Sequence, residues 1–158
     1  MLNYSVAELR ILIKRHTDMK KVLFAICMTA FLASCATSGK IRSISALAGE
    51  WNITKVEGKA VGAGNDGNAP FIGFDTKENR VYGSTGCNRL TGALNANVET
   101  GTIDFGALGS TRMMCADMKT EQAVLGALGK VSTFSMQKKG VLEFKDSTGK
   151  TVMTLKHK

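Results

Sequence analysis

The chain has 158 residues, of which 44% are hydrophobic and 22% charged, with 21 Lys+Arg against 13 Asp+Glu and a formal net charge of +8. This length and composition fit one globular domain with a substantial core and exclude a two-domain protein. Nucleic-acid binding requires a basic face with aromatic residues among the cations. Within residues 35–158 the cations are scattered singly and the densest cluster is Lys138-Lys139, so we expect no nucleic-acid partner.

An apolar run after two lysines is the first motif along the chain. Lys20 and Lys21 are typical of the positive start of an export signal, and Val22–Ala33 forms its apolar stretch. These 12 residues are fewer than the roughly 20 that a helix needs to span a bilayer. The run ends in Leu32-Ala33-Ser34-Cys35, which has the form of a lipobox, where a lipid is attached to the cysteine. The competing interpretations are an ordinary cleaved signal with a chance cysteine, and a weak membrane anchor.

The motif divides the chain into a signal peptide over residues 1–34, a lipidated tether over residues 35–46 and a domain over residues 47–158. Met19 is an alternative start, because a charged stretch precedes an already complete signal; a long n-region is the other interpretation. Cleavage before Cys35 removes five basic and two acidic residues, which leaves 16 and 11 and a net charge of +5. We expect a lipid-anchored protein of the bacterial cell envelope. Ala36 takes the place of a retaining aspartate, which favours the outer membrane, facing the periplasm.

Short segments with alternating apolar residues dominate the rest of the chain. The first strand is expected around Leu47–Ile53, where Trp51 and Ile53 fall on one face of an extended chain. Turn residues separate further strand candidates, which we place at 70–75, 80–84, 89–94, 102–105, 133–137, 141–145 and 151–156.

One segment, residues 117–130, has helix formers and an N-cap residue in Asp117. Val124, Leu128 and Val131 repeat at helical spacing with Leu125 beside them, so we expect this stripe to face the core. Many short strands and one helix predict an α+β fold. We expect a mainly antiparallel, curled or barrel-like sheet with one covering helix.

Two glycine-rich segments have different interpretations. Gly62–Gly67 matches the spacing of a dinucleotide-binding motif, but Pro70 and a strand follow it where a helix is needed, so we predict a loop. Gly83–Gly92 predicts a tight corner between strands. In the functional interpretation this corner is the rim of a binding pocket, formed by Thr85, Asn88 and Arg89. In the structural interpretation, which we favour, it is a turn fixed to Cys115.

The segment Thr111–Cys115 is apolar apart from Arg112. Met113 and Met114 either line an adaptable binding groove or, more commonly, fill a core beneath the helix. Arg112 and Met113 complete the candidate rim, and Arg112 has Asp104 and Glu121 as candidate ion-pair partners.

Two cysteines, Cys87 and Cys115, remain in the exported domain. In an oxidising compartment a disulfide is the favoured interpretation, with free thiols as the alternative. A nucleophilic or metal-binding cysteine needs a nearby histidine or further ligands. His16 leaves with the signal and His157 is penultimate, so we expect no catalytic residue, metal or cofactor.

Four blocks of sequence resemble the META domain family. They are Leu47-x-Gly49-x-Trp51, Pro70-x-Ile72-x-Phe74, Gly83-x-x-Gly86-Cys87-Asn88-Arg89-x-x-Gly92 and Thr111-Arg112-Met113-Met114-Cys115. The resemblance covers about residues 47–156, and Leu94 departs from it where the family commonly has an aromatic residue. It implies an envelope protein, often a lipoprotein, linked to heat shock and antibiotic tolerance, and it implies no catalytic residues or cofactors.

Together these features predict a non-enzymatic envelope lipoprotein, held to the membrane through Cys35, that binds a protein or surface partner in envelope stress or antibiotic tolerance. The alternative is a carrier or sensor of a small apolar ligand, held between sheet and helix near Met113 and Met114. An enzyme is the least favoured class, because the sequence pairs no nucleophile with a base.

Overall fold

The computed structural model describes residues 43–158. The predicted signal peptide, the lipidation site at Cys35 and most of the predicted tether lie outside the described residues. The first element is a short 3-10 helix, η2 (Ile44–Leu47), which Ser43 caps by accepting a hydrogen bond from the amide of Ser45. Leu47 is buried and Ile44 packs against the core, so residues that precede the predicted domain start by up to three positions also belong to the domain.

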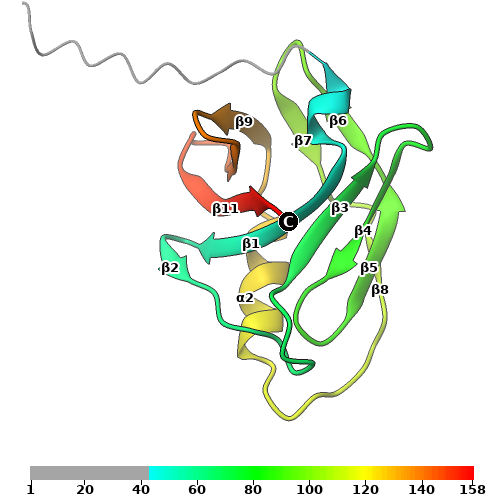
Figure 1. Cartoon of the computed structure of the whole chain (residues 1–158), viewed down its shortest axis with the longest axis vertical. Helices are drawn as coiled ribbons and strands as arrows, with labels where there is room; N and C mark the ends of the chain where they lie inside the picture. The colour runs from blue at the N-terminus through cyan, green and yellow to red at the C-terminus, as the bar shows by residue number, and fades with distance from the viewer. Residues whose placement is uncertain (1–42) are drawn as a thin grey trace, which may run out of the picture. The chain divides into compact units, whose positions relative to one another are not determined.

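Eleven antiparallel strands form one sheet. Figure 1 shows how this sheet curls. The strands are β1 (Gly49–Val56), β2 (Lys59–Ala60), β3 (Phe71–Asp75), β4 (Arg80–Ser84), β5 (Arg89–Ala93), β6 (Asn95–Asn97), β7 (Thr102–Asp104), β8 (Gly109–Ser110), β9 (Thr133–Gln137), β10 (Val141–Lys145) and β11 (Thr151–His157). Their order is β6-β7-β9-β10-β11-β1-β3-β4-β5-β8, and β2 pairs with β1 outside this path. The two ends of the path, β6 and β8, do not pair with each other, so the sheet is a half-barrel. The predicted fold class is confirmed.

The predicted strands agree with the structure to within a residue or two at most ends. Trp51 and Ile53 are both buried on β1, as the period-two pattern predicts. Residues 62–67 form a loop between β2 and β3, as predicted. The sequence pattern does not predict β2, β6 and β8, because these strands of two or three residues contain no buried apolar side chain, whereas the equally short β7 has one in Ile103.

The single α-helix of the described chain, α2 (Lys119–Leu128), contacts β1 (Figure 1). Val124 and Leu128 are buried as predicted, whereas Leu125 is 39% exposed. The helix starts two residues after Asp117, whose side chain accepts a hydrogen bond from the Lys119 amide. Within residues 43–158, no helix is both long and apolar enough to cross a membrane.

The core joins the strands on both sides of β1. Phe144 on β10 is fully buried, and its ring meets those of Phe105 and Phe74 edge-on, with centroids 5.3 and 6.4 Å away. The Trp51 indole N–H donates to the Leu47 carbonyl at 2.8 Å, which ties η2 to β1. The aromatic cluster therefore connects strands that lie far apart in the sheet order.

Replacing Phe144 tests this packing. Phe144→Ala is expected to lower the free energy of unfolding by about 3–5 kcal/mol, because it leaves a cavity between two other rings. Phe144→Leu retains most of the apolar volume and is expected to cost about 1–2 kcal/mol. Denaturant titration provides the measurement, with half-exposed Leu125→Ala as the control. Equal losses for Phe144→Ala and Leu125→Ala would contradict a core centred on Phe144.

Candidate functional site

A tight turn, residues 85–88, connects β4 to β5. Its conformation depends on Gly86, which has a φ of +113°, a left-handed value that side chains rarely adopt. A Cβ at this position would lie 2.9 Å from the Thr120 methyl group on α2. The Thr85 amide donates to the Asn88 carbonyl at 2.9 Å and closes the turn, which leaves the single proton of the Thr85 hydroxyl for another acceptor.

The carboxylate of Glu121 on α2 lies against this turn and is almost completely buried, with 2% of the residue exposed. It accepts hydrogen bonds from the Thr85 hydroxyl, the Cys87 amide (3.1 Å), the Asn88 amide (3.0 Å) and the Asn88 side-chain amide (3.1 Å). Burial raises the pKa of Glu121, but these hydrogen bonds outweigh it and hold the pKa below its ordinary value. Glu121 is therefore a structural anion that the turn holds through both oxygens, with three hydrogen bonds to Oε2 and one to Oε1.

The Asn88 side chain also forms hydrogen bonds with the segment Thr111–Cys115. Its Oδ1 accepts from the Thr111 hydroxyl at 2.8 Å and the Met113 amide at 2.7 Å. Its Nδ2 donates to the Met113 carbonyl at 3.2 Å as well as to Glu121. Since Glu121 only accepts and the Met113 amide only donates, the side-chain amide can satisfy both partners in one orientation only.

Two further links complete the junction. The disulfide Cys87–Cys115 joins the turn to the end of segment 111–115, which confirms the predicted bridge. The Asn65 side chain donates to the backbone carbonyl of Asp117 at 2.6 Å and accepts from the backbone amide of Asp117 at 3.2 Å. The backbone amide of Asn65 donates to the Gly86 carbonyl at 2.8 Å. Three loops that are distant in sequence therefore form one rigid unit.

The predicted binding rim is partly wrong. Thr85 and Asn88 are 0% and 4% exposed, because Glu121 and segment 111–113 occupy their polar groups, so neither residue forms a rim. The structural interpretation of this corner, a turn fixed to Cys115, is confirmed. Arg89 and Met113 do line a surface hollow of about 530 Å³, together with Phe71 and the disulfide.

The predictions for Thr111–Cys115 also need correction. Met113 and Met114 are 60% and 91% exposed, so they fill no core and lie outside any space between sheet and helix. Arg112 is exposed, and among the described residues it pairs with neither candidate acid. Glu121 is enclosed by the turn, and Asp104 accepts from the Gly106 amide.

The sequence did not lead us to predict Glu121 as a site residue. The available signal was its place three residues before Val124 and seven before Leu128, on the apolar stripe of the helix. A carboxylate on such a stripe indicates a buried acid with partners elsewhere in the chain. No group of three metal-ligating His, Cys, Asp or Glu side chains occurs within residues 43–158.

Glu121→Gln tests the buried carboxylate. The new NH₂ group would face the Asn88 side-chain NH₂, which cannot turn away from it, so the expected cost at neutral pH is about 1–3 kcal/mol of unfolding free energy. Because the folded pKa of Glu121 is depressed, its stabilisation is present above the unfolded pKa, about 4.3, and is lost as pH falls through the folded value. Denaturant titrations should therefore show a difference from wild type that shrinks below about pH 4. A constant difference, or an equal effect of exposed Glu78→Gln, would contradict the assignment.

The disulfide makes a separate prediction. The bridge closes a sequence separation of 28 residues, so the variant with Cys87→Ala and Cys115→Ala is expected to lose about 3–4 kcal/mol of unfolding free energy on the chain-entropy model. In protein exported by cells, peptides with these two cysteines should resist alkylation until a reductant is added. Mass spectrometry of the digested protein provides the measurement, and alkylation of both thiols before reduction would refute the bridge.

Comparisons with known proteins agree with the sequence resemblance. The sequence model of the META domain family matches residues 45–158. The chain is similar to a protein from Burkholderia xenovorans solved by NMR, at 24% identity and a TM-score of 0.57, over 72% of this chain and 86% of that one. It is similar to a second protein solved by NMR, at 25% identity and a TM-score of 0.53, over 70% of this chain and 89% of that one. No curated protein matches the chain. The chain belongs to the META domain family.

Proposed function

We propose that the chain is a lipoprotein of the bacterial cell envelope whose META domain binds a partner protein. The lipobox at Leu32–Cys35 supports export and lipidation. The disulfide Cys87–Cys115 supports an oxidising compartment, where such bridges persist. We further propose that the anchor lies in the outer membrane, that the domain faces the periplasm and that the protein acts in envelope stress or antibiotic tolerance.

The observation that carries the partner-binding proposal is the methionine loop, Thr111–Cys115. It exposes two large apolar side chains, Met113 and Met114, side by side in the sequence. Exposed apolar residues that are contiguous mark interaction sites, and methionine adapts to the shape of its partner. Arginine is enriched at protein interfaces, and Arg112 lies within the same loop while Arg89 lines the neighbouring hollow.

The loop backbone is fixed although its side chains are exposed. Asn88 binds both the amide and the carbonyl of Met113, the Thr111 amide donates to the Arg89 carbonyl at 3.1 Å, and Cys115 is bonded to Cys87. A backbone held in place before binding lowers the entropy that association must lose. This combination suits a preformed docking surface.

We propose a non-enzymatic role for the same region. Glu121, the buried acid of the junction, has a lowered pKa and accepts hydrogen bonds from the turn through both oxygens, which makes it a weak base toward a substrate proton. The ordered groups of this junction serve to hold the docking surface in shape.

In-cell crosslinking of the tagged full-length protein, followed by mass spectrometry, tests this function. The wild type is expected to capture a specific envelope protein, and the variant with Met113→Ser and Met114→Ser to capture about tenfold less, because it loses the apolar contacts. Leu125→Ser, another exposed apolar residue, is the matched control and should leave capture unchanged. Cys35→Ala should reduce capture by releasing the protein from the membrane.

Equal capture by the wild type and the double methionine variant would contradict the docking surface. Capture of abundant membrane proteins alone, with a small apolar molecule bound to the purified protein in native mass spectrometry, would instead support a ligand carrier.

A further inference from the structure

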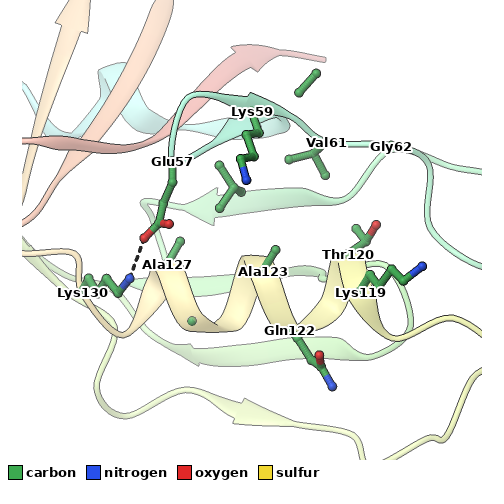
Figure 2. Close-up of a pocket in the computed structure, with 13 residues that line it drawn as sticks. Glu57, Lys59, Val61, Gly62, Lys119, Thr120, Gln122, Ala123, Ala127 and Lys130 are labelled. Atoms are coloured by element: carbon green, nitrogen blue, oxygen red, sulfur yellow. Dashed lines mark hydrogen bonds and ion pairs between the residues drawn. The ribbon is translucent and has the colours of Figure 1, made fainter.

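A second hollow of about 470 Å³ lies between the β1–β2 hairpin and α2 (Figure 2). We call it the lysine groove. Its lining shares no residue with the hollow beside the methionine loop. Its sides carry Lys59, Lys119 and Lys130. The other polar lining residues are Glu57, Thr120 and Gln122, and the rest are small or aliphatic, among them Val61, Ala123 and Gly126.

The charge along the groove is positive. Lys59 points from β2 toward α2, while Lys119 and Lys130 lie at the two ends of the helix (Figure 2). Glu57 is the one acid among the lining residues, and it already receives the Lys130 ammonium at 2.5 Å. The hydrogen bond and charge of Lys130 keep the pKa of Glu57 below its ordinary value. Lys59 and Lys119 therefore remain without an acidic partner within the groove.

The middle of the helix side of the groove is formed by small residues. Ala123 and Gly126 are exposed there, and a Cβ added to Gly126 would meet no atom within 4 Å. From Lys119 to Leu128 the helix rises about 14 Å at 1.5 Å per residue. An extended peptide of about four residues spans the same length at 3.3 Å per residue.

The hairpin side of the groove, formed by β2, favours an extended occupant. Among the described strands β2 pairs with β1 alone, so its other edge has no neighbouring strand. A strand edge offers backbone donors and acceptors to a peptide that lies alongside it. A flat lipid surface could reach the lysines on the rim but could not fill the space beside Ala123 and Gly126.

We propose that the lysine groove binds an extended, acidic segment of a partner protein, with carboxylates at Lys59 and Lys119 and small side chains against Ala123 and Gly126. This site is separate from the methionine loop and does not depend on it. A peptide that alternates glutamate with alanine has the charge, the small side chains and the length for this groove.

NMR titration of the ¹⁵N-labelled full chain, in a non-ionic detergent, tests the proposal with a six-residue peptide of alternating glutamate and alanine. Amide shifts are expected at Val61, Ala123 and Gly126. The variant with Lys59→Glu and Lys119→Glu should bind about tenfold more weakly, because two ion pairs become repulsions. The matched control, Lys138→Glu with Lys139→Glu, makes the same charge change in the turn between β9 and β10 and should change the affinity less than about twofold.

Filling the groove separates loss of binding from loss of the fold. Gly126→Gln adds a long side chain over the helix side of the groove, whereas Gly126→Ala adds one methyl group, and both replace glycine within a helix and favour folding. Peptide binding should be lost in Gly126→Gln and retained in Gly126→Ala, with thermal unfolding no earlier than in the wild type.

Three results would overturn the proposal. They are the absence of shifts at the groove, equal weakening by the two pairs of lysine substitutions, and peptide binding that survives Gly126→Gln. Whether a lipid surface occupies the groove instead is tested by flotation of the chain with phosphatidylglycerol vesicles, compared with phosphatidylcholine vesicles. Vesicle binding that depends on Lys59 and Lys119, in a chain that ignores the peptide, would show a membrane surface to be the occupant instead.

Discussion

The buried carboxylate of Glu121 is the interaction on which the candidate site depends. Removing an ionised carboxylate from water is costly, and it is tolerated only where hydrogen bonds replace the lost hydration. Here α2 supplies the anion, and the turn at residues 85–88 supplies all four donors, two of them backbone amides. The positions of the turn and the helix are thus mutually dependent, although they are more than 30 residues apart in sequence. Asn88 extends this dependence to Met113, and the disulfide adds a covalent link to the same loop.

Helix α2 therefore has two roles on two faces. One face carries Glu121, Val124 and Leu128 into the domain, where they position the turn and complete the core. The other face leaves Ala123 and Gly126 exposed beneath the β1–β2 hairpin. A helix fixed so firmly on its inner side can present an outer groove of constant shape. The methionine loop follows the same principle, because its backbone is bound while its side chains remain exposed to solvent.

Much of the fold is predictable from local patterns. Alternation located β4, β9 and β10, and helical spacing located α2, because each of these signals is repeated within a single segment. The exposure of Met113 and Met114 was not predictable in the same way. An apolar pair before a helix usually indicates burial, and the bonds that fix this loop with its methionines exposed go to Asn88, Arg89 and Cys87, which are distant in sequence. The role of Glu121 was missed for a similar reason, since its donors come from residues 33 to 36 positions earlier.

Amide hydrogen exchange at Met113 tests the central claim most directly. The Met113 amide does not touch Glu121, and its donor bond goes to the Asn88 side chain, which Glu121 orients. If the carboxylate organises the junction, Glu121→Gln will speed exchange at Cys87, Asn88 and Met113 together, while amides in β10 and β11 retain their protection. Faster exchange confined to Cys87 and Asn88, with Met113 unchanged, would contradict the account and show that the methionine loop is held independently of Glu121.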